Sequence, residues 1–201
     1  MEISRDNRSF IEIGEKTMTE KEKMLQGQLY DANHNSELIA ERQKAKESCF
    51  TYNQTIPTNM EKRIEILKNL LGSTKNNFLI EPSFQCDYGY NIHIGENFYA
   101  NHNLVILDAA EVTFGDNVLI GPNCGFYTAG HPSNVEQRRA GLEYAKPICI
   151  GNDVWIGGNV AVLPGVTIGD NSVIGAGSVV NKDIPAGVIA VGNPCKVVKK
   201  I

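Results

Sequence analysis

Aliphatic residues recur at every sixth position through the C-terminal half of the chain. The column comprises Ile150, Ile156, Val162, Ile168, Ile174 and Val180. An amphipathic helix repeats about every 3.6 residues and a half-buried strand about every two, so neither element produces this period. A period of six is typical of a hexapeptide β-helix, in which short strands form the three sides of a triangular coil. The pattern therefore predicts an all-β fold built as a parallel β-helix.

A second column lies four residues after the first and carries small or β-branched side chains: Val154, Val160, Val166, Ser172 and Ser178. We expect both columns to point inward and fill the coil. Glycine follows several members of the first column, at Gly151, Gly157, Gly169 and Gly175. We expect these glycines to supply backbone freedom at tight bends where a Cβ would clash. An ordinary β-sandwich rich in Val and Gly would instead show alternation with irregular turn spacing.

The repeat continues toward the N-terminus in two weaker runs: Ile94, Ala100 and Ile106, then Phe114, Ile120 and Phe126. The step from Ile106 to Phe114 is eight residues rather than six. We therefore expect two additional residues near Asp108 and Ala109 to bulge from a corner. Residues 128–146 are polar and have no interior column, which predicts a loop that leaves the coil.

A polar segment with helical pattern precedes the repeat. Residues 60–71 have Asn59 as an N-cap, Gly72 as a stop and an apolar stripe, so they predict a helix; residues 36–52 predict another. We expect these helices to cover the first coil, whose strand edges would otherwise be unpaired. The resulting division is a flexible extension at 1–17, a helical cap and acceptor-binding segment at 18–75, the β-helix at 76–190 and a tail at 191–201.

Composition narrows the functional classes. The 201 residues carry a formal net charge of −4, which argues against a general nucleic-acid binder. No apolar run approaches the roughly twenty residues that cross a bilayer, and no secretory signal is evident, so we expect a cytoplasmic protein. The five cysteines are odd in number and form no CxxC pair, which predicts reduced, structural thiols.

Five segments resemble the maltose and galactoside O-acetyltransferases, a branch of the hexapeptide-repeat acyltransferases. They are LYDAN at 29–33, DYGYNIHIGENFYANHN at 87–103, GDNVLIGPN at 115–123, AGHP at 129–132 and VWIGGNVAVLPGVTIGDNSVIGAGSVVNKDIP at 154–185. The resemblance extends from residue 18 to the C-terminus. It implies a left-handed β-helix, a homotrimer with active sites between subunits, and acetyl transfer from acetyl-CoA to a hydroxyl of a sugar such as maltose or glucose.

Three residues are candidates for the catalytic site, His131 and Asn101 through the resemblance and Glu143 through its place in the chain. His131 in the AGHP motif matches the catalytic histidine of the family. A sugar hydroxyl attacks a thioester poorly unless a base removes its proton, and imidazole exchanges a proton near neutral pH. Asn101 matches a family position at the acceptor site, where an amide can hold the reacting hydroxyl. Glu143, in the segment that leaves the coil, is a candidate to orient the imidazole. His34, His93 and His102 have no comparable motif.

For the acceptor, we expect recognition by Asp31, Arg42, Asp87, Asn101 and Asp108, because carboxylates accept hydrogen bonds from sugar hydroxyls and an arginine donates several. Galactoside-type members carry paired aspartates where this chain has Asp108 followed by Ala109, and a serine where it has Asp87. Both differences favour the maltose branch.

For the donor, the resemblance implies a site along the C-terminal coils. Gly158 would offer a backbone N–H to the thioester oxygen, and Trp155 would border the pantetheine arm. The remaining expected contacts with acetyl-CoA are Ala176, Asn181, Lys182, Lys196 and Lys199. The family often has arginine at the last two positions, so here lysines would meet the phosphates as point charges.

Other functions on this fold remain as alternatives. A γ-class carbonic anhydrase needs histidines with an HxxxxH spacing that the chain lacks, and we expect no metal. An acetyltransferase of an antibiotic or other xenobiotic hydroxyl would share the histidine and the donor groove. A non-catalytic scaffold would show the same repeat, because stacked coils need no ligand. A thioester mechanism at Cys124 or Cys149 has no supporting motif. We expect partners to be a small acceptor and CoA, with no nucleic acid or membrane.

Overall fold

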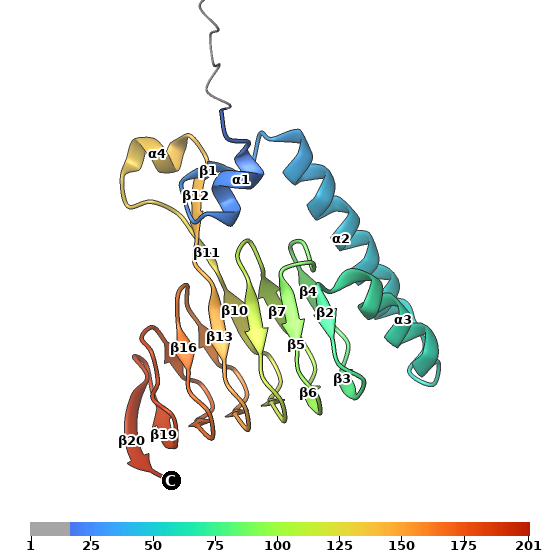
Figure 1. The fold of residues 1–201 in the computed structure, drawn as a ribbon, viewed down its shortest axis with the longest axis vertical. Helices are drawn as coiled ribbons and strands as arrows, with labels where there is room; N and C mark the ends of the chain where they lie inside the picture. Colours follow the sequence, from blue (N-terminus) through green and yellow to red (C-terminus); the bar gives the residue numbers. More distant parts are fainter. Residues whose placement is uncertain (1–16) are drawn as a thin grey trace, which may run out of the picture.

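The computed structural model describes residues 17–201 and confirms the left-handed parallel β-helix. Its strands form three sheets, one on each face of the coil, and Figure 1 shows the turns stacked from α3 (Met60–Leu70) to the C-terminus. The first face contains β2 (Ser73–Thr74), β5 (Ile92–Ile94), β8 (Val112–Phe114), β13 (Ile148–Ile150) and β16 (Thr167–Ile168). The second contains β3 (Phe78–Ile80), β6 (Phe98–Ala100), β9 (Leu119–Ile120), β14 (Trp155–Ile156), β17 (Val173–Ile174), β19 (Val188–Val191) and the antiparallel β20 (Lys196–Lys200). The third contains β4 (Phe84–Cys86), β7 (Leu104–Leu107), β10 (Gly125–Tyr127), β15 (Ala161–Val162) and β18 (Val179–Val180).

Both predicted columns lie inside the coil. The second column is buried even where it is polar: Ser172 and Ser178 are 0% exposed. Their hydroxyls donate to backbone carbonyls, from Ser172 to Pro185 at 3.0 Å and from Ser178 to Gly175 at 2.6 Å. Each small polar side chain is therefore satisfied within the coil, and the aliphatic column supplies the rest of the core.

Asparagine and aspartate hold the corners between the first and second faces. Asn97, Asn117, Asp153 and Asn171 have φ values of 56°, 59°, 57° and 53°. Their side chains connect successive coils, because the Asn97 amide donates to Asn117 Oδ1 at 2.8 Å and the Asn117 amide donates to Asp153 Oδ1 at 2.9 Å. These residue types tolerate the left-handed conformation best after glycine.

The predicted corner glycines have a different role from the expected backbone freedom. Gly151, Gly157, Gly169 and Gly175 do not have positive φ, so that part of the expectation is wrong. A Cβ would nevertheless clash, as expected. At Gly157 it would lie 2.6 Å from the backbone nitrogen of Ala176. These glycines are needed because adjacent coils approach one another closely.

Three helices form the N-terminal cap: α1 (Glu20–Leu25), α2 (Ser36–Gln54) and α3 (Met60–Leu70). They confirm the two predicted helices, and α3 has the predicted Asn59 cap. Helix α2 lies against the first coil (Figure 1). Asn53 exchanges two hydrogen bonds with the Phe84 backbone, at 2.8 and 2.9 Å, and the Tyr52 hydroxyl donates to the Ile80 carbonyl. The cap therefore covers the open end of the coil, as predicted.

Among residues 17–201, none of the helices combines the length and the apolar composition that spanning a bilayer requires. The predicted flexible extension at 1–17 lies outside the described residues except for Thr17.

The segment at 128–146 leaves the coil, as predicted, but it is an ordered hairpin rather than a loop. Its elements are β11 (Ala129–Gly130), α4 (Val135–Arg139) and β12 (Leu142–Ala145). Strand β12 pairs antiparallel with β11 and also with β1 (Tyr30–Asp31) of the cap, which makes a three-stranded sheet. The segment has no interior column because its partner is the cap rather than another coil.

The two additional residues of the eight-residue step lie in the corner between β7 and β8, as predicted, and the cap covers this corner. Asp108 and Ala109 are 0% and 1% exposed. Ala109 packs beneath the cap in a small hydrophobic core that it shares with Tyr30, Leu38 and other residues. The additional residues lie where the cap meets the coil, and the cap buries them.

Candidate active site

His131 lies directly after β11 in the hairpin. Its Nδ1 is 3.2 Å from the carbonyl oxygen of Leu142. A carbonyl can only accept, so this contact assigns the hydrogen to Nδ1 and leaves a lone pair on Nε2. Nε2 lies 4.0 Å from Oε1 of Glu143, and the histidine side chain is 53% exposed. The ring is therefore oriented by the backbone, with a basic nitrogen that solvent or a small molecule can reach.

An open groove of about 430 Å³ surrounds this imidazole. Its lining combines four titratable side chains with apolar groups: Asp87, Leu107, Tyr127, Ala129, Gly130, His131, Glu143, Leu163 and Pro164. The residues come from the hairpin and from the corners between the third and first faces, which we call the hairpin edge. The groove therefore offers both polar recognition and apolar contact next to a base.

Glu143 faces the histidine without a direct hydrogen bond to it. Glu143 was expected to orient the imidazole, but the partner of Nδ1 is the Leu142 carbonyl instead. The other carboxylate oxygen of Glu143 accepts a hydrogen bond from the Tyr30 hydroxyl at 2.9 Å. At 4.0 Å from Nε2, the carboxylate is close enough to stabilise an imidazolium electrostatically.

Two of the predicted acceptor residues lie at the hairpin edge. Asp87 lines the groove, and burial raises the pKa of its carboxyl group, although the Arg42 charge opposes that shift. Asp108 is buried beneath it and accepts backbone hydrogen bonds from Asp87, Tyr88 and Gly89 at 3.0, 2.9 and 2.7 Å. Burial raises the pKa of Asp108 to about 6. In a single chain, Asp108 therefore supports the backbone that presents Asp87.

Of the other three predicted acceptor residues, Asp31 makes contacts within the cap, and Arg42 joins the cap to the first coil. Arg42 donates to the Tyr88 hydroxyl at 2.7 Å and to the Ala32 carbonyl. Oδ1 of Asp31 accepts from the backbone N–H groups of Asn33 and His34 at 3.1 and 3.0 Å. Neither residue lines the groove around His131.

Asn101, Gly158 and Ala176 lie on a different edge, at the corners between the second and third faces. We call this the glycine edge, comprising residues 101–103, 121–123, 157–159 and 175–177. Oδ1 of Asn101 accepts from the His102 N–H at 2.7 Å. The Gly158 N–H has no acceptor within residues 17–201, whereas the Gly158 carbonyl accepts from Gly177 at 2.9 Å. Gly158 thus presents a free backbone donor.

The remaining predicted donor residues are exposed. Trp155 is 56% exposed on the outside of the second face. Lys196 and Lys199 pair with Val191 and Ile189 along the antiparallel end of that face. Asn181 and Lys182 follow β18, on the hairpin edge.

The two edges are separated by the third face. Strand β7 begins after the Asn101 corner and ends at the Asp108 corner, spanning Leu104–Leu107. At about 3.3 Å per residue, such a strand keeps the edges about 10 Å apart. One chain therefore does not bring Asn101 or Gly158 to the atoms that His131 reaches.

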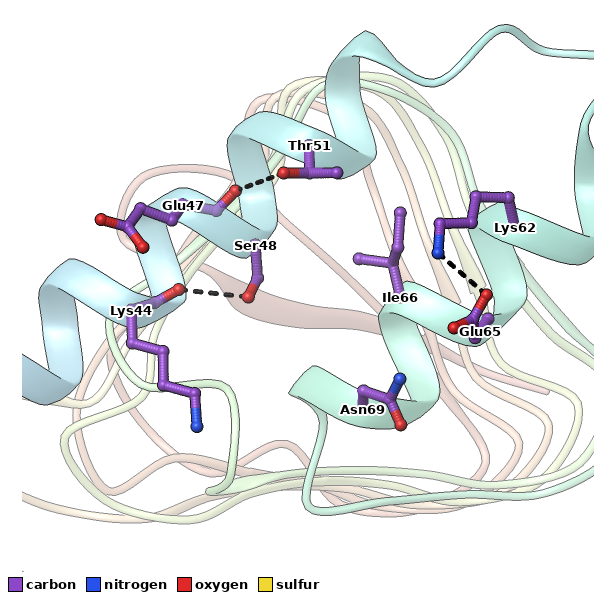
Figure 2. Close-up of a pocket in the computed structure, with 8 residues that line it drawn as sticks. All are labelled: Lys44, Glu47, Ser48, Thr51, Lys62, Glu65, Ile66 and Asn69. Carbon is purple, nitrogen blue, oxygen red and sulfur yellow. Dashed lines mark hydrogen bonds and ion pairs between the residues drawn. The ribbon is translucent and has the colours of Figure 1, made fainter.

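Another pocket, of about 260 Å³, lies between α2 and α3 (Figure 2). The hydrogen bonds among its lining residues stay within each helix: Ser48 donates to the Lys44 carbonyl, Thr51 to the Glu47 carbonyl, and Lys62 to Glu65. It contains none of the predicted site residues. In the described part of the chain, no three His, Cys, Asp or Glu side chains gather as metal ligands would.

Sequence reasoning missed the groove residues Tyr127, Leu107 and Leu163, and it missed Tyr30 behind them. Tyr30 belongs to the LYDAN segment, in which only Asp31 was predicted as a site residue. The apolar residues sit at strand ends where the outward positions looked unremarkable. Their positions in the repeat could have identified them, because each of the three ends or directly follows a strand of the third face.

Two family models match this chain. The maltose acetyltransferase hexapeptide capping motif matches residues 23–75. The bacterial transferase hexapeptide model, with six repeats, matches residues 150–182. These matches coincide with most of the helical cap and with the C-terminal coils.

Several known proteins are similar along most of their length. The galactoside O-acetyltransferase of Escherichia coli is 50% identical over 164 residues, which cover 82% of this chain and 81% of that protein. A crystal structure of a maltose O-acetyltransferase from Clostridium difficile is 52% identical, covers 92% of this chain and 98% of its own, and has a TM-score of 0.89. A galactoside acetyltransferase in complex with coenzyme A is 46% identical, with 92% of each chain covered and a TM-score of 0.88.

Proposed function

Because the chain belongs to the maltose and galactoside O-acetyltransferase family and is an acetyltransferase, we propose that it acetylates a hydroxyl of a sugar such as maltose or glucose. The acetyl donor in this proposal is acetyl-CoA. The observation that carries the proposal is the groove at the hairpin edge, where the imidazole of His131 presents Nε2 beside two carboxylates.

In the proposed reaction, His131 acts as the general base. Nε2 accepts the proton of the sugar hydroxyl as that oxygen attacks the thioester carbonyl. The resulting imidazolium retains its Nδ1–H contact with the Leu142 carbonyl and faces the Glu143 carboxylate. It then returns the proton to the departing thiolate, which leaves an acetyl ester and free CoA. Asp87 in the groove is placed to accept hydrogen bonds from other sugar hydroxyls.

The residues on the glycine edge fit a pantetheine thioester. The free N–H of Gly158 can donate to a carbonyl oxygen that develops negative charge. A Cβ at this position would lie 3.2 Å from Pro122, so glycine keeps this part of the backbone free of a side chain. Exposed Trp155 offers apolar contact, and Lys196 and Lys199 offer positive charge on the same face for phosphates. A galactoside acetyltransferase with similar structure binds coenzyme A.

A trimer is part of the proposal because the two edges must come from different chains. Along the parallel strands of the second face, the outward residues are aliphatic or aromatic: Leu79, Tyr99, Leu119, Trp155, Val173 and Ile189. Those of the third face are mostly small or apolar: Gln85, Val105, Gly125, Ala161 and Val179. Those of the first face are more polar: Ser73, His93, Thr113, Cys149 and Thr167. This pattern supports packing through the second and third faces, with the first face in solvent.

The test measures release of free CoA from acetyl-CoA with maltose, glucose, galactosides and chloramphenicol as acceptors. We expect turnover on a glucosyl sugar and a loss of about a hundredfold or more in His131→Ala. His93→Ala is the matched control, because its Nδ1 contacts Ser73 on the first face at 2.9 Å. Equal rates in the parent and His131→Ala would refute the histidine base. If chloramphenicol were the only one of these acceptors to be acetylated, the acceptor would be an antibiotic hydroxyl rather than a sugar.

A further inference from the structure

The cap and the hairpin meet in a short antiparallel pairing that places two residues face to face. Tyr30 of β1 lies directly opposite Glu143 of β12. The Tyr30 hydroxyl donates to Oε2 of Glu143 at 2.9 Å. The tyrosine is 1% exposed and packs in the small core beneath the cap. One buried hydroxyl therefore holds one oxygen of the carboxylate that faces His131.

The chemistry of this pair fixes the direction of the hydrogen bond. Burial, reinforced by the charge of Glu143, raises the pKa of Tyr30 well above its usual value, so the phenol keeps its proton. The carboxylate can then only accept. With Oε2 bound in this way, Oε1 is the oxygen that lies 4.0 Å from Nε2 of His131. Without the phenol, a glutamate side chain with three rotatable bonds would have several orientations available.

We propose that Tyr30 is a positioning residue: it holds Glu143 so that Oε1 faces the imidazole and stabilises the imidazolium that forms when His131 accepts a proton. This inference rests on the proposed function, because it needs His131 to become charged during the reaction. It links the cap to the chemistry through a single contact. The cap strand thereby has a role beyond covering the coil.

The Glu143 carboxylate stabilises His131 only once the imidazole has accepted a proton, so its loss should affect kcat rather than binding. Glu143→Gln removes the charge and keeps an oxygen that can accept from Tyr30, so it should lower kcat with little change in the KM for the acceptor. Tyr30→Phe should lower kcat roughly tenfold, because a hydrogen bond to a charged group is lost. In the Glu143→Gln background, Tyr30→Phe should lower kcat by less than about twofold, because residue 143 then carries no charge that Tyr30 could position toward His131.

Tyr52→Phe is the matched control. It deletes the same hydroxyl from another fully buried tyrosine of the cap. That hydroxyl donates to the Ile80 carbonyl and accepts from Arg63 at 3.0 Å, and neither partner lines the groove. We expect this variant to lower the melting temperature while kcat stays at the parental value. A loss of kcat equal to that of Tyr30→Phe would mean that loosening the cap is sufficient, and it would overturn the proposal.

Two further results separate this proposal from the proposed function. If Tyr30→Phe keeps the parental kcat while His131→Ala is inactive, the positioning role fails and the base stands. If His131→Ala keeps the parental kcat, the base fails and the positioning role fails with it. Should Tyr30→Phe not fold, Glu143→Asp tests position directly: it keeps the charge but shortens the side chain by one methylene group. We expect a loss of kcat close to that of Glu143→Gln, and parental kcat would overturn the proposal.

Discussion

Asn117 provides a direct test of how the corners of this coil are built. Its φ of 59° lies in the left-handed region. Its side chain accepts from the Asn97 amide at 2.8 Å and donates to Asp153 Oδ1 at 2.9 Å. Replacement by alanine and by glycine removes the same two contacts, but only alanine must hold a Cβ in the left-handed conformation. The two variants therefore separate the backbone contribution from the side-chain contribution.

The expected magnitudes follow from these contacts. The two hydrogen bonds are exposed, so their loss costs about 0.5–1 kcal/mol each. An alanine at positive φ adds about 1–2 kcal/mol, which gives about 3 kcal/mol for Asn117→Ala. A glycine avoids that cost but adds about 0.5–1 kcal/mol through the greater entropy of the unfolded chain. We therefore expect Asn117→Gly to lose about 2 kcal/mol and to be more stable than Asn117→Ala.

The assay is urea unfolding followed by circular dichroism at one fixed protein concentration, because an oligomer unfolds in a concentration-dependent way. Glu111 provides the control position, since it is exposed and its φ is not positive. There the order should reverse, with Glu111→Ala more stable than Glu111→Gly. If alanine is at least as stable as glycine at Asn117, the left-handed conformation does not explain the choice of asparagine.

Two further predictions concern the site. Burial raises the pKa of Asp108 from 3.8 to about 6 in the folded chain, so the folded state retains a proton that the unfolded state has lost. Its contribution to stability should be complete below about pH 4 and should be lost as pH rises through about 6, by about 3 kcal/mol; Asp108→Asn should abolish this slope in urea unfolding across that window. At Gly157, an added Cβ would lie 2.6 Å from the Ala176 backbone nitrogen, so Gly157→Ala should destabilise the coil by about 1–3 kcal/mol. It should also reduce the thermal shift that CoA produces, by displacing the neighbouring Gly158; an unchanged unfolding curve and CoA shift would show that the coils can separate without cost.

The coil was predictable because each turn repeats the same inward positions. Ile156 and Ile174 pair in register on neighbouring strands, as the period of six requires. The corners were less accessible, because an interior column contains no information about backbone dihedrals. Glycine was expected to provide the unusual conformation, whereas Asn97, Asn117 and Asp153 provide it at the corners between the first and second faces. The glycines at these corners, Gly151 and Gly169, are needed because the neighbouring coil leaves no room for a Cβ.

The geometry around His131 could not be derived from local pattern. Tyr30 and Glu143 are 113 residues apart, and each belongs to a strand too short to have a detectable period. The AGHP motif identified the histidine through resemblance alone. The contacts that orient the ring, from Leu142, and that hold the carboxylate, from Tyr30, depend on the pairing of the cap with the hairpin, and only the folded chain provides that pairing.

Side chains alternate between the inside and the outside of the coil along each strand, and the two sets have different roles. Inward residues make the coil, and they would serve a scaffold equally well. Outward residues distinguish the faces: Trp155 and Leu119 are 56% and 49% exposed on the second face, a high exposure for large apolar side chains in a coil whose core needs neither. The residues proposed for acetyl transfer lie at the two edges that border the third face, His131 on one and Gly158 on the other. Apolar surface on the second face, beside the Gly158 edge, is what the proposed assembly of several copies would bury, and a scaffold would not need it.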